Sequence, residues 1–280
     1  ILLTAVLIGA MFSVSAYVVC VAAPLLGKNI KGSGHIVTKT LPAPDFDAID
    51  ASRAVKVVVS AGASDIRIEA DDNLIDLVVV RAVKGKLEAT LDQKVNNIQN
   101  GNVTITVPAN GKIRSLDASS ASKIIGETTL KAGKFSIEAS SAAKIKAAVE
   151  AVSCTIETSS ASKVEASIEA ESCSLDASSA SKINASVEAV SCSVEASSAS
   201  KITLKGSAAK CTADLSSAAK LSAGDFVAAE CSVNTSSAAK AVVNCTERLH
   251  ADASSGSSIR YSGDCQTSIN KSSGGSVGRN

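Results

Sequence analysis

The sequence predicts an all-β protein, a parallel β-solenoid in which the chain winds into stacked coils of about 19 residues. Three observations lead to this prediction. A short phrase, Asp/Glu-x-Ser-Ser-Ala-Ser/Ala-Lys, recurs along the chain at steps of 18 to 21 residues. Apolar and polar residues alternate around the phrase, which is the pattern of a half-buried strand. Trp is absent and only 4 Phe and 2 Tyr occur, as a narrow bore requires.

The Ser pair of the phrase locates each repeat. A step near 19 residues is too short for a helical hairpin, so each repeat is expected to supply one coil. Seven full copies and two degenerate ones begin at Ser119, Ser140, Ser159, Ser178, Ser197, Ser216, Ser236, Ser254 and Ser272.

The strand before each Ser pair is expected to have an apolar inner side and an acidic outer side. Apolar residues stand five and three positions before the first Ser, and an acid stands two positions before it. The inward column five positions before the pair contains Cys154, Cys173, Cys192, Cys211 and Cys231. The outward column contains Asp117, Glu138, Glu157, Asp176, Glu195 and Asp214, followed by Asn234, Asp252 and Asn270.

The strand after each Ser pair is expected to begin with an exposed Lys and to continue with apolar inward residues. A looser third side is expected around Glu150, Glu169 and Glu188. Equivalent residues of stacked coils lie about 4.8 Å apart, so every column becomes a ladder. The exposed ladder is Lys123, Lys144, Lys163, Lys182, Lys201, Lys220 and Lys240.

The Cys ladder and the overall charge exclude several classes of function. Thiols in one inward column are expected to act as small apolar fillers, and bridges are disfavoured because stacked Cβ atoms lie slightly outside the disulfide range. A linear stack does not converge on a metal ion, so no cofactor is expected. The net charge is +1, and no basic run or aromatic platform predicts binding to nucleic acid.

One elongated solenoid domain is expected over residues 28–280. Residues 1–27 carry no charge and are mostly apolar, which indicates a signal peptide or a membrane anchor. Simple cleavage, lipid attachment at Cys20 and retention as an anchor all stay open. The chain is therefore expected to be exported, with membrane contact only through this segment.

The solenoid is expected to have an irregular and a regular part. Residues 32–115 lack the Ser-Ser phrase but show strand alternation, and they are expected to form irregular N-terminal coils that cap the stack. A helical turn after Asp72, with Asp72 as its cap, is expected among them. Residues 116–280 hold the regular Ser-Ser-Ala-Ser-Lys repeats.

Several segments carry a family resemblance. They are Gly32–Val37 (GSGHIV), Phe46–Ile49 (FDAI), Ile66–Leu74 (IRIEADDNL) and the closing Ser272–Val277 (SSGGSV). In this order they resemble the putative auto-transporter adhesin, head GIN domain family of exported bacterial proteins, over roughly residues 32–280. The resemblance implies a right-handed parallel β-helix at a bacterial cell envelope, with adhesion as its function and no catalytic residues to carry over. This chain differs in its Ser-Ser-Ala-Ser-Lys corners and its Cys column.

The function expected from these features is that of a non-enzymatic adhesin or surface-binding scaffold. The Lys ladder from Lys123 to Lys240 is the candidate binding surface, and an anionic polysaccharide is the partner that it suits. A plainer interpretation is that the Lys and acidic ladders are solvated faces that neutralise each other. A carbohydrate-active β-helix enzyme, with paired carboxylates in a cleft, and a self-assembling filament are the alternatives.

Overall fold

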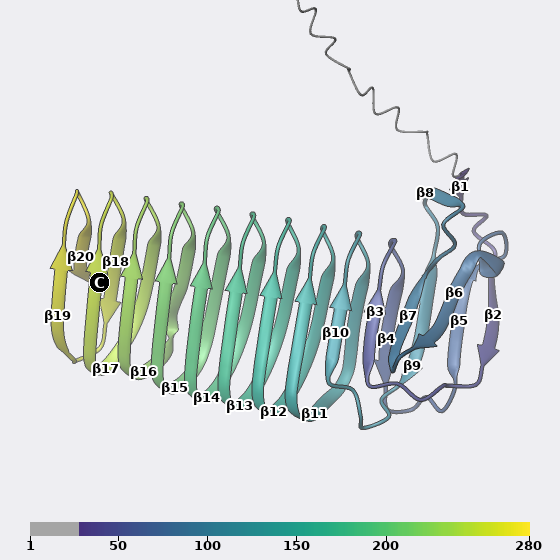
Figure 1. Ribbon diagram of the computed structural model, residues 1–280, viewed down its shortest axis with the longest axis horizontal. Coiled ribbons are helices and arrows are strands. Elements are labelled where there is room, and N and C mark those ends of the chain that lie inside the picture. Colours follow the sequence, from purple (N-terminus) through teal and green to yellow (C-terminus); the bar gives the residue numbers. More distant parts are fainter. Residues whose placement is uncertain (1–27) are drawn as a thin grey trace, which may run out of the picture.

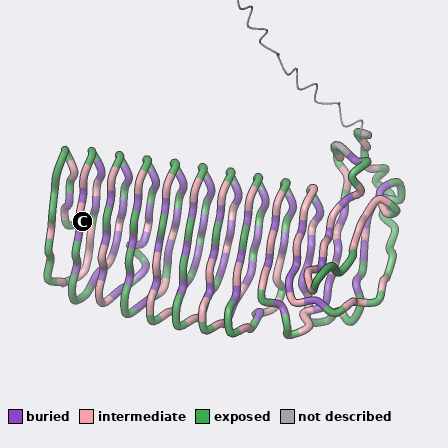
Figure 2. Tube along the Cα trace, viewed as in Figure 1, coloured by how far each residue is buried: buried purple, intermediate pink, exposed green. Residues whose placement is uncertain are grey.

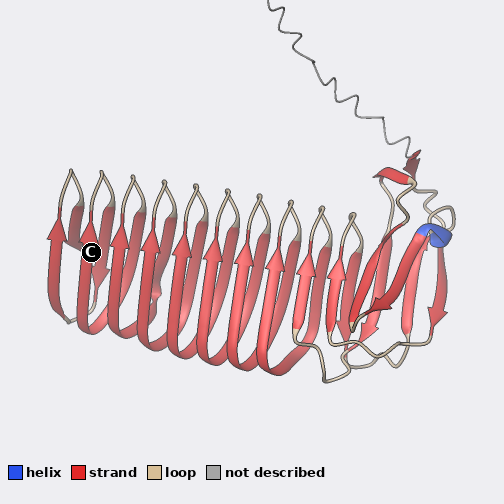
Figure 3. Ribbon diagram, in the orientation of Figure 1, coloured by secondary structure: helices blue, strands red, loops and turns tan. Residues whose placement is uncertain are grey.

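A computed structural model describes residues 28–280, and the predictions of a signal peptide, an anchor or lipid attachment at Cys20 lie outside the described residues. Parallel strands stack side by side along one axis (Figure 1). Figure 3 shows strands in every coil and a single short helix at the N-terminal end. The prediction of an all-β solenoid with coils of about 19 residues is confirmed.

Each regular coil consists of one long, bent strand and a four-residue turn. The expected third side is absent from these coils, because the strand and its pairing continue through the bend: Glu150 pairs with Glu169, and Ser153 pairs with Ser172. Each coil therefore has two flat halves that face each other across the bore. The long strands are β11 (Lys123–Ala139), β12 (Lys144–Thr158), β13 (Lys163–Ala177), β14 (Lys182–Ala196), β15 (Lys201–Leu215), β16 (Lys220–Thr235) and β17 (Lys240–Ala253).

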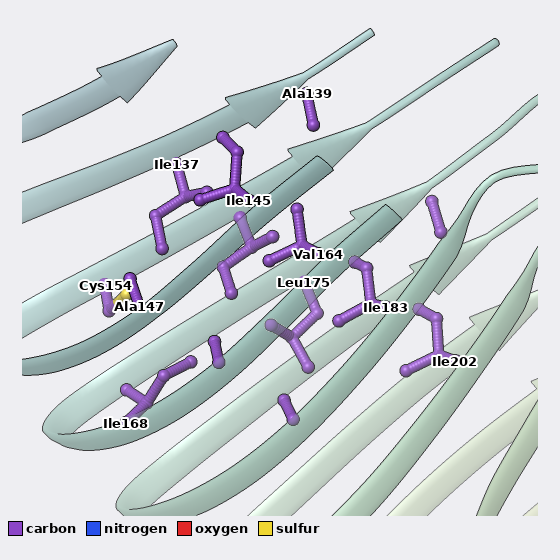
Figure 4. Packing of buried hydrophobic residues seen from close by; sticks show 14 of the residues in the cluster. Ile137, Ala139, Ile145, Ala147, Cys154, Val164, Ile168, Leu175, Ile183 and Ile202 are labelled. Atoms are coloured by element: carbon purple, nitrogen blue, oxygen red, sulfur yellow. The ribbon is translucent and has the colours of Figure 1, made fainter. Parts of the chain in front are cut away.

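The inward side chains of the two halves fill the bore. Along each strand, buried and exposed residues alternate (Figure 2). Figure 4 shows Ile145, Val164, Ile183 and Ile202 in one row, each at most 2% exposed. Burial of apolar surface contributes roughly 25 cal/mol per Å² to the free energy of folding. Each of these side chains therefore stabilises the fold by about 1.5–3 kcal/mol.

The Cys column stacks as the sequence predicts. Cys173 and Cys192 pair in register on adjacent strands, and so do Cys154 and Cys173. The thiols of this column are buried and free. Burial raises the pKa of the Cys154 thiol to about 12, so it stays protonated at neutral pH.

The turns between the long strands all have left-handed backbone and bond to one another along the stack. In the turn Ser119–Ser122, Ser120 (φ 51°) and Ala121 (φ 61°) both have left-handed backbone, as in a type I′ turn, and Ser122 N donates to Ser119 O at 3.1 Å. Ala121 N donates to Ser141 O of the next coil at 2.9 Å. The turns thus form their own hydrogen-bonded ladder along one edge.

The N-terminal part is stacked out of chain order. β3 (Ala48–Ala51) and β4 (Lys56–Ser60) form a coil that pairs with β10 (Ser115–Ala118) and β11. The coil that follows it in the chain, made of β7 (Lys86–Leu91) and β9 (Val103–Pro108), pairs with the opposite edges of β3 and β4. The chain therefore steps back toward the N-terminal end before it enters the regular coils.

Antiparallel strands cover this end of the stack. β5 (Ile66–Asp71) pairs with both β9 and β2 (Ile36–Leu41), and β6 (Val78–Val83) pairs with β7. A separate two-stranded sheet joins β1 (Lys28–Lys31) to β8 (Val95–Gln99). These strands shield edges that would otherwise be open to another chain.

The expected helical turn is present, but its expected cap is wrong. The 3-10 helix η1 spans Ile75–Leu77 with Leu74 at its N-cap, and no side chain caps it. The Asp72 carboxylate instead accepts a 2.5 Å hydrogen bond from the Ser33 hydroxyl. At the other end, the last coils are formed by β18 (Ser258–Ser262), β19 (Gln266–Lys271) and β20 (Ser276–Arg279).

Candidate functional site

The Lys residues predicted to bind a partner form one straight column on the outside of the solenoid. Each begins a strand directly after a turn and pairs in register with the Lys of the next coil; Lys56 pairs with Lys123 and extends the column by one coil. Beyond Lys240 the column ends at Ser258. We call this set the Lys column: Lys56, Lys123, Lys144, Lys163, Lys182, Lys201, Lys220 and Lys240.

The ammonium groups of the Lys column are largely free to meet a ligand. All are exposed except the half-buried Lys56 and Lys163. Within residues 28–280, the ion pair made by this column is Lys163 Nζ to Glu165 Oε1 at 2.5 Å. The hydrogen bond that Lys163 donates to Glu165 lowers the pKa of the Glu165 carboxyl group. The other outward positions beside the column are mostly neutral, so the positive charge stands largely uncompensated.

Keeping like charges in register has a cost that a ligand can remove. Two unit charges about 4.8 Å apart repel by roughly 1 kcal/mol in water, before salt screens them. A polyanion laid along the column would replace this repulsion with attraction at each coil. The fold supplies the register, so the ligand does not have to order the lysines one by one.

The acidic ladder forms a second column on the opposite face. Its members stand two residues before each Ser pair, and Asp50 and Glu88 extend it into the N-terminal part. In stacking order this acidic column is Glu88, Asp50, Asp117, Glu138, Glu157, Asp176, Glu195, Asp214, Asn234, Asp252 and Asn270.

A continuous shallow trough follows the acidic column. It is lined by the acids, by the first Ser of each pair and by the residue between them, whose side chain is buried in every coil from Ala118 to Ala253. One stretch of the trough runs from Asp50 to Asp176 and the next from Asp176 to Asn270. We call this hollow the acidic trough.

Lys86 lies in the N-terminal end of the acidic trough. Its Nζ is 2.5 Å from Asp117 Oδ2 and 3.9 Å from Asp50 Oδ2, so one ammonium group bridges two successive coils. The hydrogen bond to Asp117 raises the pKa of Lys86. Burial raises the pKa of Asp50 despite the nearby Lys86, and burial together with Asp117 and Glu157 raises the pKa of Glu138.

The interpretation that the two ladders neutralise each other through direct ion pairs is wrong. In the described part of the chain, no ion pair joins the Lys column to the acidic column. The reason is geometric, because the two columns lie on opposite halves of each coil and point away from each other. One face of the solenoid is therefore lined with ammonium groups and the other with carboxylates.

Sequence reasoning missed Lys56, Asp50 and Lys86. A signal for the first two exists in the segment Asp50–Lys56 (DASRAVK), which has the spacing of Asp117–Lys123 (DASSASK). Arg53 (φ 60°) and Ala54 (φ 61°) also have the left-handed backbone of the regular turns. No local pattern marks Lys86, because it reaches the acids only through the out-of-order stacking of β7.

Two general features of the described residues bear on the site. Across residues 28–280, no cluster of three or more His, Cys, Asp and Glu side chains is arranged to hold a metal ion. The same residues contain no helix with the length and hydropathy needed to cross a bilayer.

The straight stack of parallel coils, with its long ladders of charge, places the protein in the class of parallel β-solenoids. Over residues 45–186 and 155–265 the chain matches the family described as putative auto-transporter adhesin, head GIN domain. It belongs to this family. A comparison with curated proteins finds no match.

Three solved structures share the fold. A putative adhesin from Parabacteroides distasonis is 15% identical, with a TM-score of 0.68 over 90% of this chain and 100% of that one. A protein from the same organism described as a putative lipid binding protein is 17% identical, with a TM-score of 0.65 over 90% and 100%. A putative adhesin from Parabacteroides merdae is 19% identical, with a TM-score of 0.64 over 90% and 99%.

Proposed function

We propose that this protein is a non-enzymatic, surface-binding adhesin of the bacterial cell envelope, and that its Lys column binds a repeating anionic polymer such as an acidic polysaccharide. The observation that carries the proposal is the in-register series of ammonium groups, one per coil, on an exposed face. The description of the family as adhesins supports the same function.

Binding along the column would be multivalent. A single exposed ion pair contributes about 0–1 kcal/mol, so one Lys alone holds almost nothing. Several such contacts add up when both the polymer and the solenoid present their charges in a row, because only the first contact loses the full freedom of association. The attraction is screened over about 8 Å at physiological ionic strength, so affinity should fall steeply with added salt.

A glycan-array screen at low and high salt tests the proposal. The wild-type protein is expected to bind acidic polysaccharides, and the variant with Lys144, Lys163, Lys182 and Lys201 changed to Gln should lose at least tenfold in affinity. The matched control changes four exposed lysines outside the column, Lys39, Lys112, Lys131 and Lys210, to Gln. It removes the same charge and should bind nearly as the wild type does.

The screen also separates the proposal from its alternatives. Binding that survives both high salt and the four substitutions would exclude the Lys column as the site. The absence of any binding would favour a purely structural role. An increase in reducing ends on incubation with a bound polysaccharide would establish a carbohydrate-active enzyme instead.

A further inference from the structure

The acidic trough already holds one ammonium group of the chain itself, that of Lys86. Lys86 inserts its Nζ between Asp50 and Asp117, which belong to neighbouring coils, and contacts both carboxylates. Beyond this end the same arrangement of acid and Ser repeats coil after coil, with no Lys of the chain paired to it from Glu138 to Asp214 in the described residues. The trough thus offers a row of further ammonium sites of the Lys86 type.

The chain also carries a row of ammonium groups with the matching pitch. The Lys column and the acidic column use the same stacked coils, so both repeat every 4.8 Å or so. Both columns lie next to the turns. In each coil the Lys stands four residues after the first Ser of the pair, and the acid stands two residues before that Ser. They occupy the same height on opposite faces of the flattened solenoid.

A second copy of the chain can therefore bring one column onto the other by translation alone. Moving a copy perpendicular to its flat faces places its Lys column over the acidic trough of the first copy along several coils. The outward column next to the acids carries no charge that would repel this approach. It is hydroxylic: Ser115, Ser136, Thr155, Ser174, Ser193, Thr212 and Ser232.

We propose that copies of this protein stack laterally, with the Lys column of one copy in the acidic trough of the next. Such an interface is heterologous: each copy uses two different faces, and a free face of each kind remains at the ends of the stack. The stack can therefore grow by one copy at a time. This self-association is a function separate from the proposed binding of a polysaccharide, although both use the Lys column.

Sedimentation velocity over a range of protein concentrations at low and high salt tests the stacking. Wild-type protein is expected to sediment faster as its concentration rises at about 20 mM salt, and to return to a single monomeric species at about 500 mM salt. A wild-type protein that stays monomeric at low salt over the whole range would overturn the proposal. So would self-association that persists unchanged at high salt.

Two variants with one disabled face each make the test specific. The Lys variant changes Lys144, Lys163, Lys182 and Lys201 to Gln, and the acid variant changes Glu157, Asp176, Glu195 and Asp214 to the matching amides. Each alone should be monomeric at low salt, with self-association weakened at least tenfold. Mixed in equal amounts, they should form a complex of two chains and nothing larger, because only one pair of complementary faces remains.

The controls separate this proposal from a general charge effect and from the proposed function. The control variant, in which four lysines outside the column are changed to Gln, should stack like the wild type; these are Lys39, Lys112, Lys131 and Lys210. Its failure to stack would contradict an interface that is specific to the Lys column. A mixture of the Lys and acid variants that forms no complex would also contradict it. The acid variant keeps the Lys column, so its binding to an anionic polysaccharide reports on the proposed function independently of stacking.

Discussion

The regular coils and the N-terminal part bury similar side chains but hold their strands in place differently. In the regular coils, each residue pairs with the equivalent residue of the next coil. The interface between β12 and β13 is therefore nearly the same as the interface between β13 and β14. In the N-terminal part, single side chains fix the backbone: the buried Asp71 carboxylate accepts hydrogen bonds from Gly34 N and Asn102 N, each at 2.7 Å. Stability is thus distributed in one region and concentrated in the other.

The largest effect is therefore expected from a single change at Asp71. Asp71→Ala leaves two backbone N–H groups without their charged partner, which should cost about 3 kcal/mol or more in the free energy of unfolding. Urea unfolding measures the loss. Asp72→Ala is the matched control, because Asp72 is exposed and its carboxylate accepts a hydrogen bond from the equally exposed Ser33 hydroxyl. Similar losses for the two variants would show that Asp71 has no special role.

Overfilling the bore should come next. Ala185 is 5% exposed in an inward column, so Ala185→Phe should cost at least the 1–3 kcal/mol typical of overpacking, and the neighbouring coils should share the strain. Lys182→Ala on the outside should stay within about 0.5 kcal/mol. Thermal melts of both variants check this. Equal shifts would contradict the assignment of inward and outward columns.

A turn substitution should stabilise the regular coils. Ala180 has φ of 60°, a backbone that costs an L-residue about 1–2 kcal/mol and costs Gly almost nothing. After the greater chain entropy of Gly is subtracted, Ala180→Gly should gain about 0.5–1 kcal/mol. The sign should reverse for Ala177→Gly, because Ala177 is buried within β13. A loss for Ala180→Gly would mean that the turn has a different backbone.

The smallest effect concerns the point where the two regions meet. Burial raises the pKa of Asp50 above its ordinary value of 3.8, so the folded chain keeps this proton to a higher pH than the unfolded chain. Ionised Asp50 then destabilises the fold above its raised pKa, and the penalty disappears as the pH falls below about 4. Asp50→Asn should gain a few tenths of a kcal/mol at pH 7 and nothing near pH 3. Chemical unfolding at the two pH values checks this, and a larger gain at the lower pH would contradict it.

The contrast between the two regions also sets what could be predicted from sequence. The columns from Lys123 to Lys240 follow from the repeat alone, since a fixed step near 19 residues allows only one register. The bend near Glu150 could not be foreseen, because a strand that curves and a strand that stops have the same alternation. The place of β3 between β7 and β10 depends on long-range pairing, which no local pattern specifies. The acidic trough and its bound Lys86 depend on that pairing and were missed with it.

The central claim is that each charged column is straight and receives one residue from every coil. This includes Lys56, whose coil is stacked out of chain order. Spin labels on paired cysteines introduced at these positions, with Cys20 and Cys265 changed to Ser, measure this directly. Lys123 and Lys240 are six coils apart and should give about 29 Å, and Lys56 and Lys240 are seven coils apart and should give about 34 Å. Distances that do not rise by about 5 Å per coil, or a position of Lys56 two or more coils beyond Lys123, would contradict the account.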